Sequence, residues 1–328
     1  VDAVGSAQQR TINTVWDTAI REPLERTVLD ASNAVKAKSK WAYNVSGLQT
    51  ASCEINTAVT TGISYVCGSA ANAPAGVRQW RTSYCEKVDA VNCPQVGLVL
   101  SVDGPLTDVS DVKAYRYFSS SDESGCGTVG GQCQRVGDLF QITDALGQVT
   151  TYASYDSNGR PARVLDSNGV TTDFGYSPSG WLTSKITRSD ASGGASARDR
   201  VTIIKYDETG NVSQVIGPDG DVVTYDYDAA HRLTDITDGA GNNLHYSLDV
   251  AGNRLKEDFK DPSGNVKKTL TRIYNKLGQL QTQADASANP TDFSYDLNGD
   301  LKLMTDALGR KTQLDPDPLR RVAHTLQD

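Results

Sequence analysis

The sequence lacks any hydrophobic run long enough to cross a membrane. Its longest apolar stretch, around Val96 to Val102, falls well short of the roughly 18 to 20 apolar residues of a spanning helix. Hydrophobic residues make up only 38% of the 328-residue chain, so we expect a small interior. The 14 Tyr and 4 Trp nevertheless argue against disorder. A net charge of -8 disfavours nucleic acid or an anionic membrane as a partner.

Residues that commonly carry catalysis are equally scarce. The only histidines are His231, His245 and His324, and none belongs to a Gly-x-Ser-x-Gly or His-Glu-x-x-His motif. Ser110 to Lys113 fits the short Ser-x-x-Lys pattern, but its companion motifs are missing. We therefore expect no enzymatic activity and no catalytic residues in this chain.

Cofactor and metal motifs are incomplete. The segment from Gly125 to Gly130 has the glycine spacing of a dinucleotide-binding loop, but no strand-turn-helix pattern surrounds it. The acidic turn from Asp296 to Asp300 lacks the distal Glu of an EF-hand. No Cys-x-x-Cys occurs, and no His lies among the cysteines, which makes a zinc site improbable. We expect neither a cofactor nor a metal.

What the sequence does contain is an internal repeat with a period of 21 residues, seen in the step from Tyr155 to Tyr176. Most copies begin with an aromatic residue, usually followed by Asp, and have a Gly four positions after their first residue; the copy that ends at Gly252 and Asn253 begins with Leu248 instead. In one copy His231 occupies the Gly position. A degraded copy begins at Pro316. The defining positions are Tyr155, Gly159, Tyr176, Gly180, Tyr206, Gly210, Tyr227, Gly252, Tyr274, Gly278, Tyr295 and Gly299.

A second turn follows about ten residues after the first, as in the segments 144–147 and 306–309. Asp and Asn can bond their own backbone and Gly supplies a positive φ, so these short segments predict tight hairpin connections. Between the turns large apolar residues alternate, as at Val223, Tyr225 and Tyr227. Such alternation is typical of strands. Each repeat is therefore predicted to be a β-hairpin.

The first 136 residues follow the same pattern with interruptions. Aromatic positions at Trp16, Tyr43, Tyr84 and Tyr117 begin four further units, which makes about twelve in an all-β array. We expect one continuous array, interrupted over residues 1–136 and regular over 137–328, without a separate catalytic domain. Two other segments have distinct expectations. The segment from Val28 to Lys40 is predicted to be strand, and Ser189 to Asp199 a flexible surface loop.

All six cysteines lie in the interrupted part. Cys85 and Cys93 bracket one enlarged turn and Cys126 and Cys133 another, while Cys53 and Cys67 fall where a further connection is expected. This arrangement favours three local disulfides, Cys53 with Cys67, Cys85 with Cys93 and Cys126 with Cys133. The alternative is a set of reduced, buried thiols in a cytosolic protein. Disulfides would place the chain in an oxidising compartment.

The recurring Tyr-Asp-x-x-Gly-[Arg/Asn] turn, as in Tyr155 to Arg160 and Tyr206 to Asn211, resembles the YD repeat of bacterial Rhs proteins and, more distantly, of teneurins. The resemblance implies a curved antiparallel strip of hairpins that forms part of a spiral, hollow shell. It also implies that such a shell encloses a C-terminal toxin used in competition between bacteria. The partners would then be the rest of the same polypeptide and its toxin cargo. The start at Val1 rather than Met fits a piece of a longer protein.

Two other functions stay open. One is an extracellular adhesin or carbohydrate-binding protein that recognises a cell-surface glycan through an exposed aromatic residue such as Trp181. The other is a surface filament that self-associates through open strand edges. For the repeated tyrosines the favoured role is structural, since their regular spacing predicts a ladder of equivalent side chains. The expected location is secreted or on the bacterial surface, with cytoplasmic storage before delivery as an alternative.

Overall fold

The computed structural model describes residues 9–59, 64–69, 72–89, 91–126, 133–317 and 321–327. These residues form strands, turns and loops, and none of them is helical. The prediction of an all-β hairpin array is confirmed. The chain divides into two compact units, one reaching to Phe174 and including Arg188–Ala197, the other comprising Gly175–Thr187 and Arg198–Asp328. The change to regular repeats at residue 137 lies within the first unit.

Among its described residues, the first unit contains strands β1 to β10 and the first four residues of β11, which ends two residues beyond the boundary. They are β1 (Thr11–Trp16), β2 (Pro23–Leu29), β3 (Val35–Tyr43), β4 (Gln49–Ile55), β5 (Val77–Tyr84), β6 (Val99–Asp103), β7 (Lys113–Tyr117), β8 (Leu139–Thr143), β9 (Val149–Tyr155), β10 (Pro161–Leu165) and β11 (Thr171–Tyr176).

The second unit contains thirteen strands among its described residues. They are β12 (Leu182–Thr187), β13 (Arg200–Tyr206), β14 (Val212–Ile216), β15 (Val222–Tyr227), β16 (Leu233–Asp238), β17 (Asn243–Leu248), β18 (Arg254–Lys260), β19 (Val266–Tyr274), β20 (Leu280–Ala284), β21 (Pro290–Tyr295), β22 (Leu301–Thr305), β23 (Lys311–Pro316) and β24 (Val322–Gln327).

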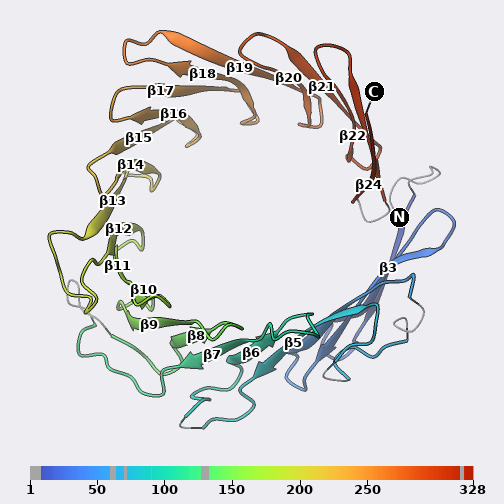
Figure 1. Cartoon of the computed structure of the whole chain (residues 1–328), viewed down its shortest axis with the longest axis vertical. Coiled ribbons are helices and arrows are strands. Elements are labelled where there is room, and N and C mark those ends of the chain that lie inside the picture. Colours follow the sequence, from blue (N-terminus) through green and yellow to red (C-terminus); the bar gives the residue numbers. More distant parts are fainter. Residues whose placement is uncertain are drawn as a thin grey trace. The chain divides into compact units, whose positions relative to one another are not determined.

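Within each unit every strand pairs antiparallel with the strand that follows it in the chain. The register of β15 and β16, for example, places Tyr225 opposite Ile236, and that of β16 and β17 places Ile236 opposite Leu244. Figure 1 shows this succession in the second unit, where β13 to β19 follow one another in chain order. Because neighbours in sequence are neighbours in the sheet, each hairpin contacts mainly the hairpins before and after it.

The first residues of the predicted repeat units, most of which are aromatic, mark the ends of the odd-numbered strands. Twelve such strands occur in the described residues, and each ends at the first residue of a repeat unit inferred from the sequence. These residues are Trp16, Tyr43, Tyr84, Tyr117, Tyr155, Tyr176, Tyr206, Tyr227, Leu248, Tyr274, Tyr295 and Pro316. The count of twelve hairpins is confirmed.

The turns have a recurring five-residue geometry. In the turn after β9, Oδ1 of Asp156 accepts hydrogen bonds from the backbone N–H groups of Asn158 and Arg160, each at 2.9 Å. Gly159 has a φ of 77° and donates its N–H to the Asp156 carbonyl. His231, at the corresponding position of another turn, has a φ of 60°. The Gly position of the repeat was predicted to supply a positive φ, and His231 does the same in its own turn by adopting the left-handed conformation.

The enlarged turns keep the base of the regular turn. Cys85 donates its N–H to the Leu98 carbonyl, and Gly97 donates to the Cys85 carbonyl. Phe118, Asp138 and Gly137 repeat this pair of bonds around the next insertion. Gly97 and Gly137 also have positive φ values, of 90° and 91°. The insertions thus extend the tip of a turn while its closing hydrogen bonds stay in place.

Two expectations about loops need correction. The segment from Val28 to Lys40 is not one strand, because Asp30 closes a turn by accepting from Ala34 and Ser32, and β2 and β3 lie on either side. The Ser189–Asp199 segment is not merely a surface loop. Gly193 is buried, and its carbonyl accepts a hydrogen bond from Arg163 at 3.3 Å. The segment therefore packs onto the strands that precede it.

Loops pack on parts of one face of the first unit. Directly opposite residues share a face, and the register carries the same face from Ile55 through Val77, Asp103 and Leu165 to Thr171. We call this the covered face. Its most buried part packs Ala51, Cys53, Ile55 and Val77 against Cys67 of the β4–β5 connection. Near β11 the residues around Gly193 contact the same face.

Glycine in these turns allows a positive φ, and at Gly210 it also leaves room for a neighbouring side chain. A Cβ added to Gly210, whose φ is 96°, would lie 2.8 Å from Cζ2 of Trp181, whereas one added to Gly278, with a φ of 75°, would have no neighbour within 4 Å. We expect Gly278→Ala to lower the free energy of unfolding by about 1 to 2 kcal/mol through backbone strain alone. Gly210→Ala should lower it further, by about 1 kcal/mol or more, because the indole ring must move.

Urea unfolding of both variants measures the difference. Equal destabilisation by the two substitutions would show that the contact between Gly210 and Trp181 has no energetic role.

Candidate functional site: the tyrosine row and its turns

The repeated tyrosines join consecutive hairpins. Each lies at the end of an odd-numbered strand, and its hydroxyl donates to the first carbonyl of the preceding even-numbered strand. Tyr206 donates to Leu182 at 2.8 Å, for instance, and Tyr295 donates to Leu280 at 2.8 Å. We call the tyrosines that make this bond the tyrosine row: Tyr43, Tyr84, Tyr117, Tyr155, Tyr206, Tyr227, Tyr274 and Tyr295.

Burial favours the protonated form of three of these hydroxyls, those of Tyr117, Tyr155 and Tyr227. Tyr155 is only 5% exposed, and burial raises the pKa of its phenol. Burial also raises the pKa of Tyr117 and of Tyr227. A protonated phenol donates its hydrogen to a carbonyl, which a phenolate cannot do. These three hydroxyls therefore remain donors in the links between hairpins.

The carboxylates of the adjoining turns are held in their charged form. The Asn211 side-chain amide donates to Asp207 at 3.0 Å, and Arg232 donates to Asp228 at 2.7 Å. These hydrogen bonds are the main cause of the lowered pKa values of Asp207 and Asp228. The position four residues after the turn Asp therefore supports the turn when it is Arg or Asn.

Trp181, the aromatic residue that the adhesin hypothesis expects to be exposed, packs partly against its own repeats. Its ring is half-buried and lies 5.0 Å, centroid to centroid, from the ring of Tyr206. The backbone of Gly210 closes in on the indole from the neighbouring turn. These contacts leave Trp181 less surface for stacking on a sugar.

The three disulfides join the pairs that the sequence favours. Cys53–Cys67, Cys85–Cys93 and Cys126–Cys133 have Cα–Cα distances of 5.8, 5.3 and 5.3 Å. Each lies in or closes an enlarged connection, so the insertions are cross-linked to the strip. The dinucleotide-like glycine pattern also falls in the third insertion, but its residues 127–130 lie outside the described residues.

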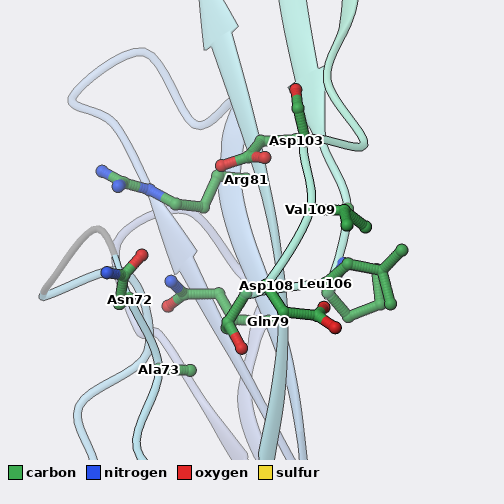
Figure 2. Close-up of a pocket in the computed structure, with 12 residues that line it drawn as sticks. Asn72, Ala73, Gln79, Arg81, Asp103, Leu106, Asp108 and Val109 are labelled. Carbon is green, nitrogen blue, oxygen red and sulfur yellow. The ribbon is translucent and has the colours of Figure 1, made fainter. Parts of the chain in front are cut away.

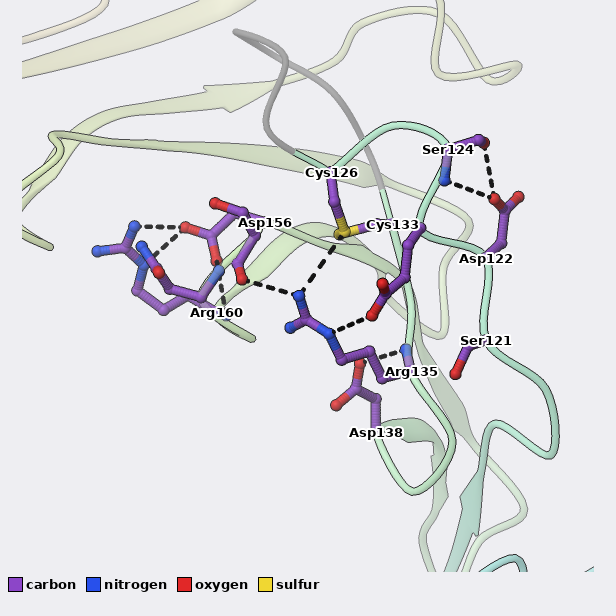
Figure 3. Close-up of a disulfide and its surroundings, with 12 residues drawn as sticks. Ser121, Asp122, Ser124, Cys126, Cys133, Arg135, Asp138, Asp156 and Arg160 are labelled. Carbon is purple, nitrogen blue, oxygen red and sulfur yellow. Dashed lines mark hydrogen bonds and ion pairs between the residues drawn. A yellow bond between two sulfur atoms is a disulfide. The ribbon is translucent and has the colours of Figure 1, made fainter.

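Arg135 connects the third disulfide to the next repeat, as Figure 3 shows. Its Nη2 lies 3.9 Å from Sγ of Cys126 and donates to the Ser157 carbonyl at 3.0 Å. Its Nε donates to Oε1 of Glu123 at 2.7 Å. Cys133 also exchanges two backbone hydrogen bonds with Tyr155. The insertion is thus fixed onto the hairpin that follows it.

The three histidines lie on different elements of the described part of the chain. Nδ1 of His245 lies 2.9 Å from Oδ1 of Asp235 on the neighbouring strand, while His231 lies in a turn and His324 in the exposed strand β24. No group of three or more His, Cys, Asp or Glu side chains among the described residues is placed to hold a metal ion. The described residues also contain no helix that is long and apolar enough to span a membrane.

Comparison with known proteins agrees with this repeat geometry. A family model described as RHS Repeat matches residues 135–166, 155–194 and 206–242, which include four of the aromatic strand ends. Residues 135–194 and 206–242 of this chain are Rhs repeats. Its Rhs repeats are also similar to a region of double-stranded DNA deaminase toxin A from Burkholderia cenocepacia (strain H111), with 29% identity over 183 residues. That alignment covers 56% of this chain and 11% of the toxin.

Solved structures share the fold of this chain. The crystal structures of TcdB2-TccC3-TEV and of TcdB2-TccC3 without its hypervariable C-terminal region each give a TM-score of 0.55 at 14% identity. Both matches cover 96% of this chain and 16% of the solved chain. This chain therefore spans about a tenth of the length of the similar toxin and about a sixth of the chains in these two structures.

The links made by the tyrosine row can be tested one at a time. We expect Tyr206→Phe to lower the free energy of unfolding by about 1 kcal/mol, because the Leu182 carbonyl loses its donor while the ring stays. Tyr225→Phe is the matched control, since the Tyr225 hydroxyl has no hydrogen-bond partner among the described residues, and it should change stability little. Urea unfolding of both variants is the measurement, and equal effects would contradict a linking role for Tyr206.

The turn carboxylates predict instability in acid. Hydrogen bonding from Lys267, 2.8 Å away, is the main cause that lowers the pKa of Asp261 to about 2. An unfolded Asp has a pKa of about 3.9. The stabilisation from Asp261 is therefore complete above about pH 4 and is lost as the pH falls towards 2.

Asp261→Asn removes the titrating group but keeps an oxygen acceptor, as Asn275 does in its own turn. We expect the variant to lose less stability between pH 4 and pH 2 than the parent does in urea unfolding. Asn275→Asp is the reverse control and should lose more. An unchanged pH dependence in both variants would contradict the role given to these carboxylates.

Proposed function

We propose that this chain is a wall segment of an Rhs-type shell that encloses a C-terminal toxin for competition between bacteria. The observation that carries the proposal is the linkage between hairpins, in which ladder pairing and the tyrosine row extend through each unit. Such linkage builds a continuous wall from short repeats. The similar region in a DNA deaminase toxin makes up 11% of that protein, which fits a role as one part of a large toxin polypeptide.

The wall itself has no catalytic role in this proposal. Its partners are the remaining repeats of the same polypeptide and the toxin cargo, and any enzymatic activity belongs to the cargo. The strands β1 and β24 each pair with one neighbour among the described strands, so each has an open edge to which a further repeat can be added.

The three disulfides support a location in an oxidising compartment, on the cell surface or outside the cell. Storage in the cytoplasm before delivery would require the thiols to be oxidised later. The adhesin alternative has less support, because Trp181 packs against its own repeats.

Electron microscopy of the full-length parent protein tests the proposal. The parent is compared with a variant from which only the cargo region is deleted. We expect hollow particles with internal density in the parent and the same particles without that density in the variant. Open strips or fibres without enclosed density would overturn the shell function. Retention of the internal density after deletion would equally contradict enclosure of a cargo.

A further inference from the structure

Two enlarged connections on the covered face form a cavity together with strands β5 and β6. One is the β4–β5 connection, which contributes Asn72 and Ala73, and the other joins β6 to β7 and contributes Asp108. Gln79 and Arg81 of β5 and Asp103 of β6 form its floor. The cavity has a volume of about 290 Å³. All of these elements belong to the first unit.

The β4–β5 connection is fixed to the sheet by several bonds. Oε1 of Gln79 accepts hydrogen bonds from the Tyr65 hydroxyl and from the Gly68 N–H, both at 2.9 Å. Lys40 donates to the Tyr65 carbonyl at 2.7 Å, and the Cys53–Cys67 disulfide joins the same connection to β4. Gln79 is only 5% exposed. One wall of the cavity is therefore held in place without a ligand.

The cavity contains charges of both signs that do not neutralise each other. Arg81 and Asp103 lie directly opposite on β5 and β6. In Figure 2, however, the Arg81 guanidinium extends away from the Asp103 carboxylate, on the side of Asn72 and Gln79. Among the described residues, Arg81, Asp103 and Asp108 make no hydrogen bond or ion pair within the protein. Elsewhere on the covered face Asp173 pairs with both Arg163 and Arg188.

We propose that this cavity binds a small zwitterion, an amino acid or a dipeptide with a free ammonium and a free carboxylate. The ligand carboxylate lies against the Arg81 guanidinium, whose planar donors match two carboxylate oxygens. The ammonium lies against Asp103 or Asp108, whose oxygens accept its three N–H groups. The side-chain amides of Asn72 and Gln79 favour a polar ligand. The cavity volume of about 290 Å³ is several times the roughly 30 Å³ that one water molecule takes up in the liquid, so the cavity has room for a small organic molecule.

The test uses the full chain with its disulfides intact and three probes, L-serine, L-glutamine and glycylglycine. Titration calorimetry and ligand-observed NMR should show saturable binding of at least one probe at millimolar concentration. The N-acetyl and C-terminal amide derivatives of that probe should bind at least tenfold more weakly, because each lacks one of the two charges. This comparison does not depend on any variant folding.

Variants then locate the site. Arg81→Gln and Asp103→Asn should each weaken binding at least tenfold. Arg78→Gln is the matched control, because Arg78 lies on the same strand but stacks over Trp80, 5.0 Å away, on the other face. It should leave affinity unchanged. Absence of saturable binding by all three probes would overturn the proposal. Equal binding of the derivatives that lack one charge, or full affinity in Arg81→Gln, would overturn it too.

Discussion

The hydrogen bond from each row tyrosine to the preceding hairpin sets the geometry on which the repeats depend. Strand pairing alone holds two neighbours together but tolerates a slip in register, which would move every side chain to the other face. The tyrosine hydroxyl reaches the first carbonyl of the preceding even-numbered strand, as from Tyr227 to Val212. A slipped strand would carry the phenol away from this carbonyl. One bond per hairpin therefore specifies the register as well as adding stability.

The bases of the turns explain why the strip accepts insertions. The bonds that close a turn lie between its first residue and the two residues before the next strand, as at Cys85, Gly97 and Leu98. Chain added beyond these bonds does not change the pairing of β5 with β6. The insertions can therefore acquire other roles, such as covering a face or forming a cavity. Their disulfides restrict loops that have few strand neighbours of their own.

The sequence predicts the features that depend on local contacts. Strand ends, turn positions and the number of hairpins follow from the spacing of aromatic residues, Asp and Gly, because each turn is closed by its own residues. The strand register and the acceptor of each tyrosine hydroxyl depend on the neighbouring hairpin. The repeat pattern therefore predicts a ladder of equivalent tyrosine side chains but not the carbonyl to which each hydroxyl donates. Val28 to Lys40 shows the limit of periodicity, since its alternation continues through the turn at Asp30.

Contacts distant in sequence were harder to predict for the same reason. Whether Trp181 is exposed depends on the positions of Tyr206 and Gly210 in the following hairpin. The Ser, Ala and Gly content of residues 189–199 is typical of a flexible loop, but it does not reveal that Gly193 meets Arg163. The cavity depends on two insertions about thirty residues apart and on a register that brings Arg81 opposite Asp103. No local motif marks that combination.

The low hydrophobic content follows from the same architecture. A single layer of strands has no closed interior of its own, so most side chains stay partly exposed and few apolar residues are needed. In the second unit a polar row crosses four strands, with Asp235 opposite His245, His245 opposite Asp258 and Asp258 opposite Thr269. Asp258 accepts from Thr269 at 2.6 Å and pairs with Lys256 at 2.8 Å. Ion pairs and hydrogen bonds of this kind occupy positions that a two-layer sheet would fill with apolar residues. Among the described residues, a hydrophobic core forms where a connection covers the sheet, around Cys53 and Cys67.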